Sequence, residues 1–219
     1  MTTASARVVQ TIPTTKTAHA TESMLEADAL LVLVARSMRK GRSPVVRVQT
    51  QVLVKYTIGS VNKKHWFDLV LTYADGRTGY YAIKKEGDGH LVEHEIELID
   101  NQVFATSRCF ARYVTSDMLP KPQVNLAREF MRSLEVSNSV LNNAIVTKLK
   151  ANGGRATVHT LLTDLTAGYT YADGWTAIHQ LMGTGLINHD HPSGGAASIA
   201  ARSWVSFAKG QKHDTARAA

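Results

Sequence analysis

Apolar and polar side chains alternate along the first half of the chain with the spacing of β-strands. Residues 45–58 (VVRVQTQVLVKYTI) alternate in this way, which predicts a strand. Residues 67–73 and 78–84 are rich in β-branched and aromatic side chains, and they are separated by Asp75 and Gly76, a pair suited to a type I′ turn. The pattern therefore predicts a strand followed at once by a β-hairpin.

Helical spacing surrounds these strands. Residues 23–38 (SMLEADALLVLVARSM) predict a helix with Ser23 as its N-cap and Glu26 at the capping-box position. Another helix, a strand and a third helix are predicted at residues 91–103, 109–115 and 126–134. This order of elements predicts an α/β module with a mixed sheet.

The second half of the chain has a different pattern. Three helices are predicted, and residues 185–207 then read as a strand, a glycine-rich turn and a strand. Three helices followed by a small hairpin are typical of a winged helix, whose third helix commonly enters a DNA groove. The predicted helices lie at residues 139–151, 157–165 and 171–182.

The proline-containing tract LPKPQ at residues 119–123 reads as a linker, so the domain boundary is expected within residues 119–138. Both ends of the chain have the composition of tails. The expected divisions are a flexible tail at 1–20, a first domain at 21–135, a winged-helix-like domain at 136–208 and a flexible tail at 209–219.

Composition narrows the class of partner. The 219 residues suffice for one large or two small domains, and the formal net charge of +7 favours a polyanionic partner. The single cysteine, Cys109, excludes an intramolecular disulfide and indicates a reducing compartment; a small buried apolar role suits it better than a nucleophile. No apolar run is long enough to span a bilayer, so we expect a soluble cytoplasmic protein without a membrane partner.

One constellation in the first half suggests chemistry. Asp68 lies near the start of the hairpin's first strand, Lys84 ends its second strand, and Glu26 lies on the preceding helix. Hydrolysis of a phosphodiester requires a divalent metal held by oxygen ligands, and a nearby lysine can stabilise the charged phosphate. The spacing is therefore compatible with a nuclease site, although such short patterns also arise by chance.

The segments SMLEADALLVL, HWFDLVLTYADGR and YYAIKK, followed by the winged-helix-like half, resemble the TnsA family of endonucleases. This family belongs to the PD-(D/E)XK superfamily, and the resemblance covers residues 22–207. It implies a restriction-endonuclease-like mixed sheet flanked by helices, then a small winged-helix-like α+β domain. The implied activity is a metal-dependent endodeoxyribonuclease that nicks the 5′ ends of a transposon, with Mg²⁺ as cofactor and Mn²⁺ as a substitute. The implied partners are double-stranded DNA at the transposon ends, a TnsB-like transposase and a TnsC-like ATPase regulator.

Residue by residue, the resemblance makes Asp68 the central metal ligand, Glu26 the helix glutamate with Glu22 as its alternative, and Lys84 the charge-stabilising lysine. The main-chain carbonyl of Ile83 is a further candidate ligand. Candidate contacts to the DNA backbone are Lys85, which follows the motif, and a basic run after the first helix made of Arg36, Arg39, Lys40 and Arg42.

One position departs from the family pattern. Ala82 stands where the family has Glu or Gln, so a metal ligand or water-orienting group is missing. Three explanations are open. The site is disabled, naturally or by deliberate substitution; the carboxylate has moved to Glu86 or to the pair Glu93 and Glu97; or the Ile83 carbonyl and water molecules suffice.

Three hypotheses therefore stand side by side. The first is the TnsA-like endonuclease, the second a non-catalytic subunit that binds DNA and the transposase, and the third a phage or mobile-element nuclease of the same superfamily that acts alone. Among the remaining residues, Trp66, Trp175 and Trp204 are expected to fill cores. His189 and His191 are expected on an exposed wing.

Overall fold

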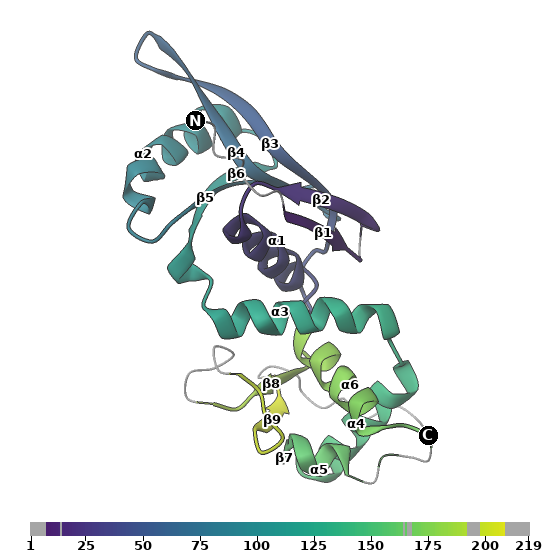
Figure 1. Ribbon diagram of the computed structural model, residues 1–219. Helices are drawn as coiled ribbons and strands as arrows, with labels where there is room; N and C mark the ends of the chain where they lie inside the picture. Colours follow the sequence, from purple (N-terminus) through teal and green to yellow (C-terminus); the bar gives the residue numbers. More distant parts are fainter. Residues whose placement is uncertain (1–7, 14, 164, 166–167, 192–197, 209–219) are drawn as a thin grey trace.

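The computed structural model describes residues 8–13, 15–163, 165, 168–191 and 198–208 (Figure 1). The protein is a mixed α/β chain. A four-stranded mixed sheet with helices forms the first half, and a small antiparallel sheet of three strands lies near the C-terminus. None of the helices in these ranges is long and apolar enough to cross a membrane.

The four-stranded sheet has the order β3-β4-β5-β6. The pairs β3–β4 and β4–β5 are antiparallel, whereas β5 and β6 are parallel. A parallel pair needs a crossover, and here it is formed by α2 (Gly89–Ile99) and the π-helical turn η1 (Asp100–Phe104). The strands are β3 (Val45–Ile58), β4 (Val61–Tyr73), β5 (Thr78–Lys84) and β6 (Cys109–Thr115), which confirms the predictions for β3, β5 and β6.

The two faces of this sheet are covered by different helices. On one face, α1 (Met24–Ser37) packs its apolar side against a core that includes Leu69 and Ile83. On the other face, α2 packs against a second core that includes Val70 and Ala82. Neighbouring residues of β4 and β5 thus alternate between the two cores, as the strand period of two requires.

Strands β3 and β4 both rotate at one position, so that residues of the same parity on either side of it pack in different cores. Along β3, Val48 packs in the core beneath α1, but Val52 packs in the core beneath α2, although both have the same parity. Gln51 lies between them with a φ of 54°, in the left-handed region. On β4 the same exchange separates Leu69 from Phe67, so both strands rotate at this position.

Residues 8–13 and 15–21 correct the expectation of a flexible N-terminal tail over 1–20. They form an antiparallel hairpin of β1 (Val8–Ile12) and β2 (Thr17–Thr21). Ile12 is fully buried and joins the core beneath α1, which anchors the hairpin. The tail expected at 209–219 lies outside the described residues.

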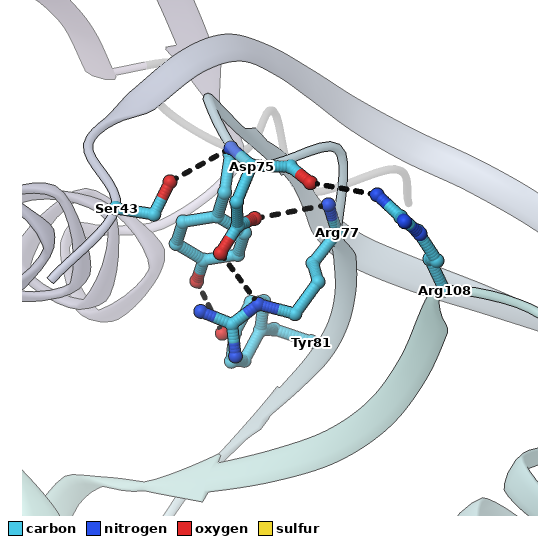
Figure 2. Close-up of polar contacts among 6 residues, drawn as sticks. Ser43, Asp75, Arg77, Tyr81 and Arg108 are labelled. Carbon is cyan, nitrogen blue, oxygen red and sulfur yellow. Dashed lines mark hydrogen bonds and ion pairs between the residues drawn. The ribbon is translucent and has the colours of Figure 1, made fainter.

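The turn between β4 and β5 differs from the expected type I′ turn. Gly76 has a φ of 83°, but Asp75 does not have a positive φ. Tyr73 donates its N–H to Arg77, and Gly76 donates to Tyr73, which is the geometry of a three-residue loop with one left-handed residue. Figure 2 shows Arg77 and Arg108 around Asp75; the hydrogen bond from the Arg77 backbone, foremost, lowers the pKa of Asp75.

Helix α3 (Lys121–Ser133) joins the two halves and corrects the expected linker at 119–123. The helix begins at Lys121 and has Pro122 in its first turn. Proline is tolerated there because the N–H that it lacks would have no partner within the helix. Its face packs into the core beneath α1 and also against α6 (Tyr171–Gly183). The two helices are so close that a Cβ on Gly183 would lie 1.9 Å from the ring of Phe130.

The second half encloses its own core, with Leu141, Ile178 and Val205 fully or almost fully buried. The predicted helices are present, although α5 is shorter than expected. The three-residue strand β7 is too short for its pattern to be recognised. The bounds are α4 (Ser139–Ala151), β7 (Arg155–Thr157), α5 (Val158–Leu162), β8 (Ile187–His189) and β9 (Trp204–Phe207), with short 3₁₀ turns η2 (Ser116–Met118) and η3 (Leu134–Val136). The sheet order is β7-β9-β8.

Candidate functional site

Asp68 lies where β4 and β5 separate. The last residue pair of their ladder is Leu69 with Tyr81. One residue further, the Asp68 carboxylate accepts a hydrogen bond of 2.6 Å from the backbone N–H of Ile83. A strand N–H at such a fork needs a partner, so the carboxylate has a structural role at this point. It also holds Asp68 beside the residues that precede Lys84.

Lys84 ends β5 and is paired in register with Thr115 of β6. Ile83 packs beneath α1 and Ala82 beneath α2, so strand alternation directs Lys84 to the side of α2. Lys84 is partly exposed, and within the described part of the chain it forms no ion pair with Asp68. The structure thus brings the Asp68 carboxylate to the backbone next to Lys84 without joining the two side chains.

Ala82 is completely buried. Its methyl group lies in the core beneath α2, in the same cluster as Phe67, Val70 and the partly buried Tyr80. A carboxylate at this position would enter an apolar environment, which is costly without a cation or hydrogen-bond donors. The alanine is therefore well suited to packing, and it contributes no side-chain oxygen to the site.

Glu26 acts as a capping residue of α1. Its Oε1 accepts from the Ser23 hydroxyl at 2.9 Å, and its Oε2 accepts from the Glu22 N–H at 2.9 Å. Ser23 in turn accepts from the Glu26 N–H at 3.2 Å. Both carboxylate oxygens are thus engaged at the helix start, as in a capping box. The alternative, Glu22, is exposed.

The carboxylates proposed to replace the missing one lie elsewhere. Glu93 accepts a hydrogen bond of 3.1 Å from the Tyr113 hydroxyl, which raises the pKa of Tyr113. Tyr113 is on β6, and β5 separates that strand from Asp68 on β4. Glu97 lines the same groove of about 520 Å³ as Glu93. Glu86 lies in the exposed turn after β5.

These positions do not form a complete metal site. Within the described ranges, no group of three or more His, Cys, Asp and Glu side chains is placed to hold a metal ion. Mg²⁺ requires six oxygens in near-ideal geometry and is usually held by one or two carboxylates together with substrate phosphates. At the fork Asp68 supplies a carboxylate, and one of its oxygens is already bonded to Ile83. The described side chains alone therefore do not supply a complete set of ligands for the divalent metal implied by the resemblance.

The basic run after α1 faces the second half of the protein. Arg36 donates to the side chain of Gln123 at 2.8 Å, and Arg39 donates to that of Asn188 at 3.3 Å. The Lys40 N–H donates to the carbonyl of Thr184 at 2.8 Å. Partial burial, and then the neighbouring Arg39, lower the pKa of Arg36. Arg39 and Lys40 thus help to join the halves, whereas Arg36 contacts α3.

The other two candidate DNA contacts have simpler surroundings. Arg42 is exposed, and its N–H donates to Arg39. Lys85 is exposed directly after β5. Both remain accessible to an anionic partner.

A cavity of about 500 Å³ lies between α1, α3, α6 and β8, with Arg36 and Arg39 in its wall. His189 also lines it and is only 7% exposed, which corrects the expectation of an exposed wing residue. Among the described residues, its Nδ1 has no hydrogen-bond partner. His191 is exposed, with its ring centroid 5.5 Å from that of His189.

Two of the three tryptophans are also placed differently than expected. Trp66 is 56% exposed and Trp204 is 44% exposed, and the Arg155 guanidinium lies 4.6 Å above the ring centroid of Trp204. Only Trp175 packs against a core, that of the second half. The exposed Trp66 lies beside Lys64 on β4, a feature that the strand pattern alone did not reveal.

No known protein family and no curated protein matches this chain. The fold and the site therefore define its class: a mixed α/β protein with a carboxylate at a strand fork, followed by a small helical half with a three-stranded sheet.

Proposed function

We propose that this chain is a TnsA-like subunit of a transposition machinery that binds double-stranded DNA at the transposon ends. In this proposal the first half has the restriction-endonuclease-like fold of the PD-(D/E)XK superfamily with an incomplete metal centre. The observation that carries it is the position of Asp68 at the fork of β4 and β5, beside the strand that ends in Lys84. This is where the resemblance expects a nuclease centre.

The second half supports the DNA-binding part of the proposal. Helices α4, α5 and α6 precede the pair β8 and β9, an order typical of winged helices. The net charge of +7 favours a polyanion. The partners implied by the resemblance, a TnsB-like transposase and a TnsC-like ATPase regulator, belong to the same proposal.

DNA binding without metal tests this function. Fluorescence anisotropy of a labelled duplex would be followed with the whole protein in EDTA at increasing salt. If the protein makes several phosphate contacts, raising the salt from about 50 to 200 mM should lower its affinity for DNA by a factor on the order of 10³. The reason is that binding releases counterions from the DNA, which higher salt opposes. Absence of binding at low salt, or binding that requires Mg²⁺, would contradict the proposal.

Metal-dependent cleavage of the 5′ strand is the second candidate function, because Asp68 is held next to the segment that carries Lys84. The variants Ala82→Glu and Ala82→Gln restore the missing side-chain oxygen. Cutting of a labelled transposon end by either variant with Mg²⁺ and the partner transposase, but not by the natural sequence, would show a centre that lacks one group.

The control for that experiment is Asp68→Asn in the Ala82→Glu background, which should abolish the restored cutting. Cutting by the natural sequence would establish the endonuclease and reject the non-catalytic function. If neither the natural sequence nor the two variants cut, the endonuclease is rejected.

A further inference from the structure

Strands β3 and β4 continue far beyond the rest of their sheet. The β4–β5 ladder covers residues 69–72 of β4, whereas the β3–β4 ladder runs on to the pair Ile58 and Val61. Residues 52–67 therefore form a two-stranded ribbon, here called the β3–β4 arm, which projects from the body of the protein (Figure 1). At about 3.3 Å per residue, the β4 side of the arm is about 20 Å long.

One face of the arm is fixed to the crossover between β5 and β6. The Tyr56 hydroxyl donates to Glu95 of α2 at 2.5 Å, and His65 Nδ1 lies 3.1 Å from the same carboxylate. At the arm's free edge, the Gln102 side chain exchanges hydrogen bonds with the backbone of Thr57. The arm is therefore held in place by contacts on this side.

The opposite face carries unpaired positive charge. Lys55 and Lys64 are direct cross-strand partners, and both are exposed. Like charges that face each other across a ladder are destabilising. Within the described residues, no carboxylate lies within ion-pair distance of either lysine. Residues 45–67 contain neither Asp nor Glu, so the arm itself offers no compensating charge; the first carboxylate on β4 is Asp68, just beyond the arm.

The same face carries an exposed aromatic side chain. Trp66 is 56% exposed, and its cross-strand partner is Leu53; this pair lies two positions along the ladder from Lys55 and Lys64, on the same face. Folding thus leaves two cations and a large aromatic ring on one side of a ribbon. Such a face costs stability in isolation and is expected where an anionic partner binds.

We propose that this face of the β3–β4 arm is a binding surface for the sugar-phosphate backbone of duplex DNA. The inference rests on the proposed DNA-binding function and assigns to it residues outside the candidate nuclease site. Lys55 and Lys64 contact phosphates, and Trp66 packs against the sugar or base edges beside them. A two-stranded ribbon has the width that the major groove of B-DNA admits, which favours DNA over an acidic protein surface.

The double variant Lys55→Gln/Lys64→Gln tests the surface. Its affinity for a labelled duplex would be measured by anisotropy at several salt concentrations in EDTA, beside the natural sequence. Loss of two phosphate contacts should reduce the slope of log affinity against log salt by about 1.8, at about 0.9 per contact. Because the substitution also removes a like-charge pair, the melting temperature should stay the same or rise, which separates lost binding from lost folding.

The matched control is Lys16→Gln/Lys121→Gln, which removes the same charge from two exposed lysines outside the arm. This control should reduce the slope of log affinity against log salt by clearly less than the arm variant does. Equal slopes for the natural sequence and the arm variant would overturn the arm surface while leaving the proposed function intact. An arm variant that binds DNA normally but loses the TnsB-like transposase would overturn it too, in favour of an acidic protein partner. Absence of DNA binding by the natural sequence would overturn both proposals.

Trp66 supplies a second readout that does not depend on affinity. The chain has three tryptophans, so the variant Trp175→Phe/Trp204→Phe leaves Trp66 as the single indole emitter. Bound duplex should shield Trp66 from acrylamide quenching. Unchanged quenching in a saturated complex would contradict the assigned surface.

Discussion

At the scale of single residues, the candidate site depends on how each carboxylate is already used. Asp68 is bonded to the backbone of Ile83, and both oxygens of Glu26 are bonded at the start of α1. The capping role of Glu26 is visible in the sequence, because Ser23 precedes it by three residues. The bond from Asp68 to Ile83 is not, because it depends on where two strands separate.

Replacement of Asp68 tests its structural part. Asp68→Ala removes the acceptor of the Ile83 N–H and should lower the free energy of unfolding by about 1–3 kcal/mol. Asp68→Asn keeps a side-chain oxygen and should cost less. Urea denaturation of both variants measures the difference. Equal stability of Asp68→Ala and the natural protein would show that the fork does not need the carboxylate.

Because His179 on α6 is buried, the free energy of unfolding should depend on pH. His179 is 6% exposed; desolvation lowers its pKa, and nearby Glu129 opposes this shift. The unfolded chain therefore binds the proton more readily, so stability falls as the pH drops below about 6.5, the ordinary histidine value.

The His179→Gln variant should show a smaller loss of unfolding free energy between pH 7 and pH 5.5, measured by urea denaturation at each pH. The control His94→Gln replaces an exposed histidine and should retain the natural slope. An unchanged slope in His179→Gln would contradict this account of the buried ring.

At the scale of elements, the helices and strands that the sequence predicts correctly are those with a clear pattern of apolar residues. β3, β5, β6 and α4 have the predicted bounds because the sequence pattern marks them directly: alternating or β-branched and aromatic residues in the strands, and a helical apolar spacing in α4. The first part of β4 (VNKKHW) was missed because the arm's exposed face carries polar residues. β1 and β2 lie in a segment whose composition resembles a tail; β2 (TAHAT) is dominated by Thr and Ala, and β1 (VVQTI) has only five residues. The start of α3 is hidden by its prolines.

The contact between α3 and α6 yields a prediction at this scale. Gly183→Ala would place a Cβ 1.9 Å from the Phe130 ring, so the variant should lose about 1–3 kcal/mol through overpacking. Gly174→Ala, in the same helix, meets only the ends of two leucine side chains and should lose less. Thermal unfolding compares the two. A Gly183→Ala variant as stable as the natural protein would contradict the close contact.

At the scale of the whole molecule, positive charge is distributed over both halves. The β3–β4 arm projects from the first half, α3 connects the cores, and α6, β8 and β9 belong to the second half (Figure 1). The basic residues after α1 contact the second half across this junction. In the proposed function the protein is one DNA-binding unit with two contact regions, the β3–β4 arm and the region of α6, β8 and β9. Among the described residues, the fork at Asp68 has no group of three side chains placed to hold a metal ion.

Hydrogen exchange with and without duplex DNA, in EDTA, tests this central claim most directly. The account predicts slower amide exchange on DNA binding in the β3–β4 arm and in the region of α6, β8 and β9. Unchanged exchange throughout both regions, at DNA concentrations that saturate the protein, would contradict it.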